Sequence, residues 1–171
     1  MSESYSLALP TLQTDCLTLR QLTSTDAEQI FLLRSDVRVN KYLDRPFCHS
    51  QDDALAFIQK VRENNFLYWA ISEIGGTTLI GTICIFDLSP EKKTCEIGFE
   101  LLPLFQGKGF MTEAIQAIID FATNQLGVHT IKAVAHRDNE RSISLLQRLN
   151  FTASSPLDDP GSHLLKFKKV I

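Results

Sequence analysis

The residues with the clearest chemical potential form one short segment, QGKGFM at residues 106–111. Its two glycines let the backbone turn where a side chain would clash. The residues that follow have helical periodicity, so the segment leads into a helix start. There the first N–H groups lack intrahelical partners and the helix dipole adds partial positive charge. The segment is therefore typical of an anion site, in particular one for phosphate groups.

Two common phosphate motifs do not fit this segment. A P-loop requires GxxxxGK[ST], but Lys108 is followed by Gly109, and no glycine stands five residues before Gly107. A dinucleotide fingerprint requires GxGxxG, but Thr112 occupies the place of the third glycine, where close packing of helix on sheet is needed. A plain structural turn remains the alternative to an anion site.

Two acidic residues precede the segment on a predicted strand. Side chains alternate along a strand, so Glu96, Gly98 and Glu100 face the same side. The glycine between the acids predicts either a bulge or a close approach of a ligand to the backbone. A carboxylate whose pKa is raised toward neutrality by burial suits a general base for an amine. Either acid can take that role, and a solvent-facing strand acid is the alternative.

The sequence predicts no metal site. The four histidines include no pair at metal-ligand spacing, and the four cysteines form no CxxC pair. Cys84 and Cys95 lie in strand-like runs and are interpreted as core residues. His136 ends a strand near the predicted site and is a candidate for contact with substrate or cofactor. Free thiols and the lack of a signal-like N-terminus predict a cytoplasmic protein.

The hydrophobic pattern supplies the elements that would position these residues. Strands are predicted at residues 17–22, 66–74, 79–86, 95–101, 130–135 and 164–171. Helices are predicted from about 26 to 34, 54 to 61, 111 to 126 and 139 to 149. The middle strands form an antiparallel meander, and the strand–helix–strand order after it implies a parallel crossover. We therefore predict an α+β fold with a mixed, mostly antiparallel sheet of about six or seven strands and about four helices.

Length and charge limit the classes of function. The chain has 171 residues without a repeat or linker, so residues 1–171 are interpreted as a single domain. A net charge of −3 provides no domain-wide basic surface, which argues against nucleic acid as a partner. No apolar run approaches the length of a membrane span, so no membrane partner is expected.

Three stretches resemble the GCN5-related N-acetyltransferase (GNAT) superfamily, and more closely its branch of ribosomal-protein N-terminal (RimJ/RimL-type) acetyltransferases. The first is EIGF at 96–99. The second, QGKGFMTEA at 106–114, is similar to the family's [QR]xxGx[GA] loop, with Met111 where Gly or Ala is usual. The third, at 139–151, has the Asn-x-x-Ser spacing and ends in Asn-Phe, where the branch usually has Gly-Phe.

The resemblance implies an enzyme, an acyltransferase that moves an acetyl group from acetyl-CoA to a primary amine by direct transfer in a ternary complex. It makes Glu96 the first choice for the catalytic base, with Glu100 as the alternative, and Ser142 the proton donor to the leaving sulfur. For Asn139 and Ser142 an ordinary helix cap is the competing explanation. The implied cofactor-binding residues are Phe99, Leu101, Gln106, Gly107, Lys108, Gly109, Phe110, Met111, Asn139 and Ser142.

The acceptor is the part that the sequence determines least. By resemblance it is a protein N-terminal amine, such as that of a ribosomal protein. A small-molecule or antibiotic amine is one alternative, and a non-catalytic CoA-binding regulatory module is another. In this family the first helices and their connection wall the acceptor pocket, which makes Asp44, Arg45, Tyr68 and Trp69 candidates without assigning any of them. The resemblance also allows a homodimer.

Overall fold

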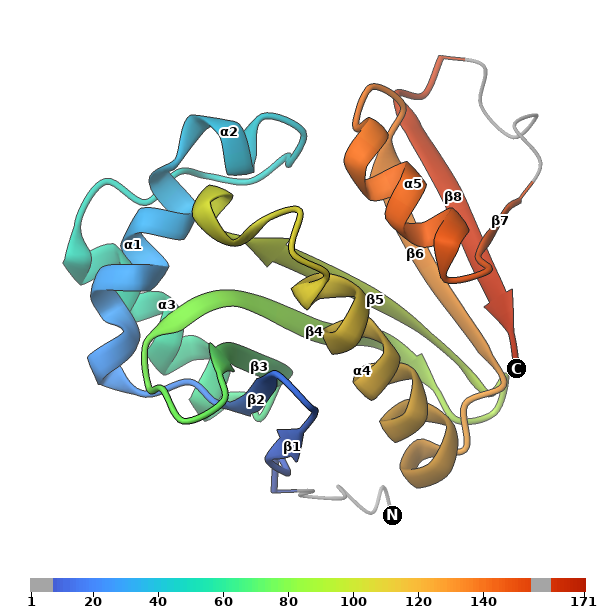
Figure 1. Ribbon diagram of the computed structural model, residues 1–171, viewed down its shortest axis with the longest axis horizontal. Coiled ribbons are helices and arrows are strands. Elements are labelled where there is room, and N and C mark those ends of the chain that lie inside the picture. The colour runs from blue at the N-terminus through green and yellow to red at the C-terminus, as the bar shows by residue number, and fades with distance from the viewer. Residues whose placement is uncertain (1–7, 155–160) are drawn as a thin grey trace.

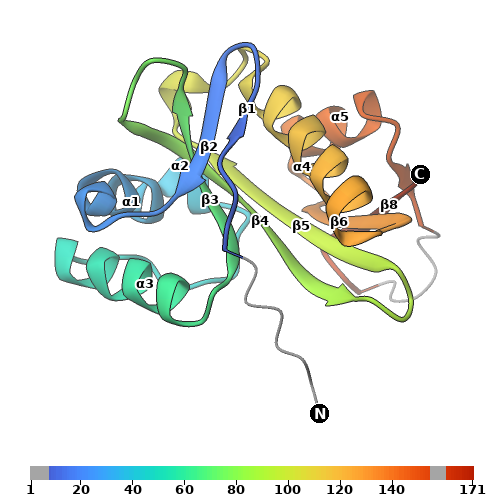
Figure 2. The same cartoon turned by 90° about the horizontal axis from the view of Figure 1, so that it is seen from below.

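The computed structural model describes residues 8–154 and 161–171. Within them, a sheet of 8 strands has the order β1-β2-β3-β4-β5-β6-β8-β7, with helices on both faces (Figures 1 and 2). This confirms the predicted α+β fold with a mixed, mostly antiparallel sheet. The described residues hold more strands and helices than predicted, because β1, β7 and α2 are only 2, 2 and 4 residues long. None of the helices in these residues is long and apolar enough to cross a membrane.

The N-terminal part contributes one edge of the sheet and three helices. Its elements are β1 (Leu12–Gln13), β2 (Leu17–Gln21), a 3₁₀ turn (Ser24–Asp26), α1 (Ala27–Ser35), α2 (Val37–Asn40) and α3 (Gln51–Glu63). Two side chains cap these helices. The Asp36 carboxylate accepts from the N–H groups of Arg38 and Val39 in α2, and the Ser50 hydroxyl accepts from the N–H of Asp53 in α3. The short α2 lies where the sequence pattern is irregular.

The predicted meander is formed by β3 (Leu67–Glu73), β4 (Leu79–Ser89) and β5 (Thr94–Leu101). The pairing of β4 with β5 is regular through Gly98, so the bulge considered there is absent, and the register shift lies between Phe86 and Ser89 instead. A Cβ on Gly98 would lie 3.2 Å from the sulfur of Cys84. The glycine therefore makes room for the neighbouring strand's side chains.

The C-terminal part begins with a 3₁₀ turn (Pro103–Phe105) and the long helix α4 (Phe110–Leu126), which ends at Gly127 in the left-handed conformation, φ 65°. The remaining elements are β6 (Thr130–His136), α5 (Glu140–Arg148), β7 (Thr152–Ala153) and β8 (Leu164–Val170). Asn150 has φ 63° and takes the left-handed position after α5, as predicted. The β5–α4–β6 unit is the expected parallel crossover, since β5 and β6 are paired in parallel.

Two apolar cores hold the layers together. The larger lies between the sheet and the α4–α5 side, and includes Ile115, Ile118 and Phe167. The smaller lies between the other face of the sheet and α1 and α3, and includes Ile30 and Ile58. Figure 2 shows these helix pairs on opposite sides of the sheet. The helices on the two faces thus hold the sheet in place, including β5, which pairs with β4 on one side and with β6 on the other.

Candidate active site

The central feature of the site is a separation of β5 from β6. The two strands pair only from Thr94 to Ile97 and from Thr130 to Ala133. Beyond these residues β5 continues along β4, whereas β6 stays paired with β8 to its end at His136, so β5 and β6 diverge in a V (Figure 1). The end of β5 therefore presents a backbone edge without a strand partner.

The N–H groups of Phe99 and Leu101 point into this V. The next residue, Leu102, donates its N–H to Ile80 O on the β4 side at 2.9 Å. N–H directions alternate along an antiparallel strand, so those of Leu101 and Phe99 point away from β4. Among the described residues neither N–H has a partner. An extended ligand with amide groups can therefore bind here in the manner of an added strand.

The glycine loop lies at the wide end of the V. Gly107 and Gly109 have φ 77° and 82°, a backbone conformation that favours glycine. No atom lies within 4 Å of a Cβ placed on either, so the conformation, not the space, requires glycine. Within the described part of the chain, none of the N–H groups of residues 107–112 has a hydrogen-bond partner. They form a set of free donors at the N-terminus of α4.

The side chain of Gln106 connects three parts of the site. Its Nε2 donates to Leu101 O at the end of β5 at 2.9 Å, and its Oε1 accepts from Arg141 Nη1 on α5 at 2.6 Å. The loop, the end of β5 and the start of α5 are therefore held together, although Gln106 and Arg141 are 35 residues apart. Arg141 is not among the residues predicted from the sequence, although its place beside Ser142 at a capped helix start was an available signal.

The predicted pair at the start of α5 acts as a helix cap. Asn139 Oδ1 accepts from the Ser142 N–H at 3.3 Å, so this spacing forms a helix cap, a role that is compatible with cofactor binding. Asn139 Nδ2 and the Ser142 hydroxyl make no hydrogen bond to the residues described, and both side chains are half-buried. The pair is thus brought to the site by the Arg141–Gln106 contact with polar atoms free for a ligand.

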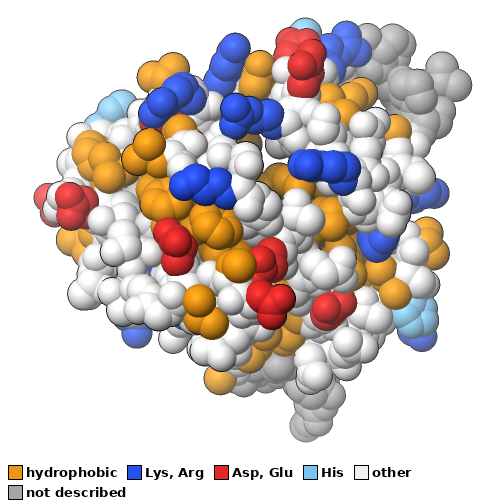
Figure 3. All heavy atoms as spheres, viewed as in Figure 1, with side chains coloured by type: hydrophobic (Ala, Val, Ile, Leu, Met, Phe, Trp, Pro, Cys, Tyr) orange, Lys and Arg blue, Asp and Glu red, His pale blue; other side chains and the backbone are white. Residues whose placement is uncertain are grey.

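Charge on the α4–α5 face suits an anionic ligand. Lys108 in the loop and Arg141 on α5 are exposed. Figure 3 shows most of the Lys and Arg side chains of this face in its upper half, where the wide end of the V lies. Glu113, in the first turn of α4, accepts from the Cys16 N–H at 2.7 Å and so faces the N-terminal segment, as predicted, not the loop.

Glu96 lies at the narrow end of the V, on the sheet face opposite α4. It is half-buried and pairs with Phe86 on β4 and Lys132 on β6. Burial raises the pKa of the Glu96 carboxyl, and the nearby Asp87 raises it further, while Lys132 and Lys166 lower it. The net direction is upward, which is the direction expected for a general base near neutral pH.

Glu100, the second acid on β5, has a different environment. Its carboxylate is buried, accepts from the Thr82 hydroxyl at 3.1 Å and forms an ion pair with Arg45. Arg45 also donates from Nε to Asn40 Oδ1 at 2.8 Å, and Tyr68 bonds to Thr82 at 3.1 Å. This network fixes the loop after α2 against β5. Glu100 therefore already has a cation and a donor within the protein.

The four candidates for the acceptor pocket lie in different environments. Arg45 and Tyr68 belong to the network around Glu100, and Asp44 is exposed. Trp69 does not line the site: it is fully buried in the larger core, donates from Nε1 to Pro10 O at 2.9 Å and packs edge-on against Phe121. Trp69 differs from Tyr68 because neighbouring residues of a strand point to opposite faces of the sheet, so the two side chains lie on opposite sides of β3.

His136 stands at the wide end of the V. Its ring lies 5.0 Å from that of Tyr42, which follows α2, and 5.7 Å from that of His163, which precedes β8. Asp138 Oδ2 lies 3.7 Å from His136 Nδ1. These rings connect the loop after α2 with the far arm of the V. Within the described residues, no group of three His, Cys, Asp or Glu side chains could hold a metal ion.

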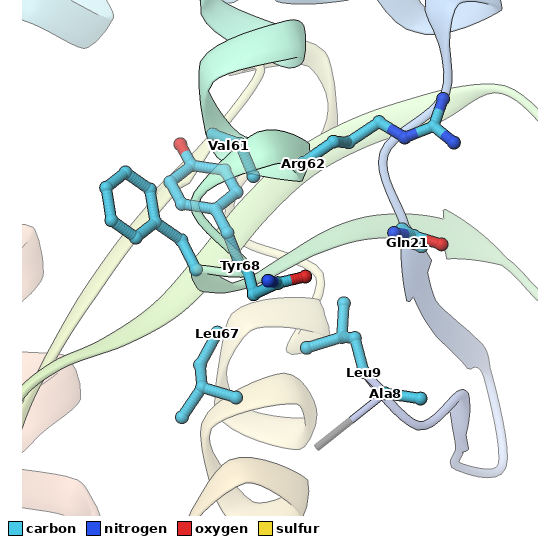
Figure 4. Close-up of a pocket in the computed structure, with 9 residues that line it drawn as sticks. Ala8, Leu9, Gln21, Val61, Arg62, Leu67 and Tyr68 are labelled. Carbon is cyan, nitrogen blue, oxygen red and sulfur yellow. The ribbon is translucent and has the colours of Figure 1, made fainter. Parts of the chain in front are cut away.

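A separate cavity shares only Tyr68 with the site residues described above (Figure 4). It is lined by the N-terminal segment, the end of β2, the C-terminal part of α3 and the start of β3, including Leu9, Arg62 and Leu67. Its volume of about 250 Å³ is below the usual range of small-molecule sites. It contains none of the predicted catalytic or cofactor-binding residues.

Comparison with known proteins identifies the family. Residues 17–152 match the family model described as acetyltransferase (GNAT) domain. The chain belongs to the GNAT family of acetyltransferases. It is 35% identical over 146 residues to the uncharacterized N-acetyltransferase YoaA of Bacillus subtilis, covering 83% of this chain and 82% of that protein. The predicted enzyme class, a GNAT-type acyltransferase, is thereby confirmed.

Solved structures agree with this assignment. The microcin C7 self-immunity acetyltransferase MccE, in complex with acetyl-CoA and AMP, has a TM-score of 0.76 and 25% identity, with 92% of this chain and 94% of that chain covered. RimL, a ribosomal L7/L12 α-N-protein acetyltransferase in complex with coenzyme A, has a TM-score of 0.77 and 20% identity, covering 95% and 98%. The second likeness concerns the fold alone.

Proposed function

We propose that this protein is an acetyl-CoA-dependent N-acetyltransferase, with residues 1–171 forming one catalytic domain that acts on a primary amine in a ternary complex. One observation supports this most strongly. Two sets of backbone donors without partners, Phe99 and Leu101 on β5 and residues 107–112 in the loop, lie along one V-shaped opening. A CoA molecule has an amide-containing arm joined to a diphosphate, which matches these two sets in turn.

The cofactor would bind through these groups. The N–H groups of residues 107–112, with Lys108, suit the diphosphate, because a helix start with free donors attracts anions. The N–H groups of Phe99 and Leu101 suit the amides of the pantetheine arm, and Asn139 Nδ2 is free to bind the same arm. Met111 contributes its backbone N–H, so its buried side chain in place of Gly or Ala does not obstruct the loop. Gln106 positions the loop through its side chain.

The chemistry would then be divided among three groups. Acetyl-CoA supplies the thioester. Glu96 accepts the proton of the ammonium and leaves the amine as a nucleophile, a step that its raised pKa favours. Backbone N–H groups of β5 stabilise negative charge on the carbonyl oxygen. As the C–N bond forms and the C–S bond breaks, the Ser142 hydroxyl gives its proton to the departing sulfur and takes the remaining proton that the attacking nitrogen loses. Glu100 is the weaker candidate for the base because Arg45 and Thr82 already occupy its carboxylate.

The acceptor we favour is the N-terminal amine of a protein, in the manner of the RimJ/RimL branch. RimL supports this choice through its fold, whereas MccE is similar to this chain and carries an immunity function against microcin, which keeps a small-molecule amine as the second candidate. A CoA-binding module without catalysis would have no use for an acid such as Glu96 beside the thioester. A homodimer and a cytoplasmic location remain predictions from the sequence.

Binding and turnover test this proposal separately. CoA and acetyl-CoA at about 100 times their dissociation constants should stabilise the protein by about 2.7 kcal/mol, and ATP should do so much less. Thiol release should then be measured against N-terminal peptides and small amines. Stabilisation by ATP without stabilisation by CoA would refute the cofactor assignment. Binding of CoA without turnover of any amine would favour the regulatory module.

A further inference from the structure

The sheet face around Glu96 is uncovered. On this face, register places Phe86, Glu96, Lys132 and Lys168 in one row across β4, β5, β6 and β8. The next positions on β6 and β8 are Val134 and Lys166, followed by His136 and Leu164. No helix of the described residues lies over β5, β6 and β8 on this side (Figure 2). Phe86, Val134 and Leu164 are accordingly 42%, 37% and 50% exposed.

Charge on this face is segregated. The acids Glu96 and Asp87 lie toward β4 and β5, and the exposed Lys132, Lys166 and Lys168 lie on β6 and β8. None of the three lysines forms an ion pair with a described residue. Lys132 stands directly opposite Lys168, an arrangement of like charges that destabilises a strand pair. The fold therefore retains unneutralised positive charge a short distance from the proposed base.

We propose that the acceptor is an acidic peptide, bound on this face with its N-terminal amine at Glu96 and its following acidic side chains at Lys132, Lys166 and Lys168. The inference rests on the proposed function, because it names the substrate class of the same site. The peptide's charges match the segregation of the face. Its terminal ammonium meets the acids at β4 and β5, and its carboxylates meet the lysines at β6 and β8.

Strand spacing indicates which peptide positions are read. Adjacent strands are about 4.8 Å apart, so Lys132 and Lys168 stand about 5 and 10 Å from Glu96 across the sheet. An extended peptide advances about 3.3 Å per residue. Acidic residues at about positions 2 to 4 would therefore reach the lysines when the amine is at Glu96. The exposed Val134 and Leu164 would contact the apolar parts of the same residues.

The experiment compares peptides that differ only in charge. Each has the same first residue, with Asp or Glu, their amides, or Lys at positions 2 to 4, and kcat/KM is measured by thiol release. The acidic peptide should exceed its amide counterpart by about tenfold, the combined effect of two or three exposed ion pairs. The ratio should fall severalfold between about 0.05 and about 0.5 M salt, because screening weakens such pairs.

Charge reversal gives a gain-of-function readout. Lys166→Glu with Lys168→Glu should lower kcat/KM for the acidic peptide and raise it for the lysine peptide. Lys60→Glu with Arg62→Glu on α3 changes the net charge equally and should leave the preference unaltered. Thermal stabilisation by CoA shows that each variant is folded. A preference reversed in the first variant alone supports the inference.

The outcomes separate the two proposals. Turnover of all peptides with equal kcat/KM, the result expected if the lysines merely keep β8 from pairing with other chains, overturns the acidic-peptide inference and leaves the acetyltransferase proposal intact. Turnover of small amines but of no peptide does the same. Absence of both CoA binding and amine turnover overturns the acetyltransferase proposal itself.

Discussion

The ion pair between Arg45 and Glu100 provides a quantitative test of how the two acids of β5 divide their roles. Both side chains are largely buried, with 18% and 7% of their surface exposed. Arg45→Met keeps much of the side chain's volume but leaves the Glu100 carboxylate buried without its cation. Breaking a buried pair from one side costs about 3–5 kcal/mol. In a domain of this size the melting temperature should fall by roughly 6–20 °C.

The reverse change should be milder. In Glu100→Gln the amide oxygen still accepts from the Thr82 hydroxyl, and Arg45 keeps its hydrogen bond to Asn40, so we expect a loss of about 1.5–3 kcal/mol. The double variant Arg45→Met with Glu100→Gln contains no unpaired buried charge. Its loss should therefore be smaller than the sum of the single losses by at least about 1 kcal/mol.

Urea unfolding followed by circular dichroism measures these free energies, and thiol release at a temperature where all variants are folded measures their activity. Glu100→Gln should keep kcat within a few-fold of the parent. Additive single losses, or a loss below about 1 kcal/mol for Arg45→Met, would refute the description of this pair as a buried support. A larger fall in kcat for Glu100→Gln than for Glu96→Gln would move the catalytic base to Glu100.

Three further predictions concern the other parts of the site. Glu96→Gln should lower kcat by about 10²–10⁴-fold and remove the rise of kcat/KM with pH. Burial raises the pKa of Glu96, so the protonated carboxyl stabilises the folded state below pH 4.5, and this stabilisation is lost as the pH rises through the raised pKa. Glu96→Gln should therefore unfold at a higher urea concentration than the parent at pH 7, with little difference near pH 4. Gly109→Ala should lower the free energy of unfolding by about 1 kcal/mol and weaken CoA binding measured by calorimetry. The control Gly75→Ala, at a similar φ in the hairpin after β3, should lower the free energy of unfolding equally and leave CoA binding unchanged. Gln106→Met removes the contacts to Leu101 O and Arg141, and should raise the dissociation constant for CoA by about tenfold while the far-ultraviolet spectrum is retained; an unchanged constant would show that the bridge is dispensable.

Local signals in the sequence were sufficient for most of the fold. The spacing of Ile115, Ile118 and Ala122 gave α4, Gly127 gave its end, and the alternation in β5 placed Glu96 and Glu100 on one face. These features depend on neighbours within a few residues, and periodicity records them directly. Short elements such as α2 were missed because four residues complete barely one helical turn.

The parts that the sequence could not give depend on contacts between distant residues. Nothing in residues 94–101 tells where pairing with β6 stops, because the V is set by where β6, paired with β8 along its whole length, leaves β5. Likewise, Trp69 was an unassigned candidate for the acceptor pocket until its strand face was known, and the contact of Arg141 with Gln106 joins segments 35 residues apart. Such pairs become visible only when the layers are assembled.

The difference between Glu96 and Glu100 follows from the same layering. The acids are four residues apart on one face of β5, so the strand alone gives them equivalent positions. The loop after α2 crosses that face at Glu100 and brings Arg45, which neutralises one carboxylate. No described helix or loop covers Glu96, so its cationic neighbours are the lysines of β6 and β8, which are open to solvent. A carboxylate with a fixed cation supports structure, whereas one facing an open, positively charged surface is available to a substrate that brings its own charges.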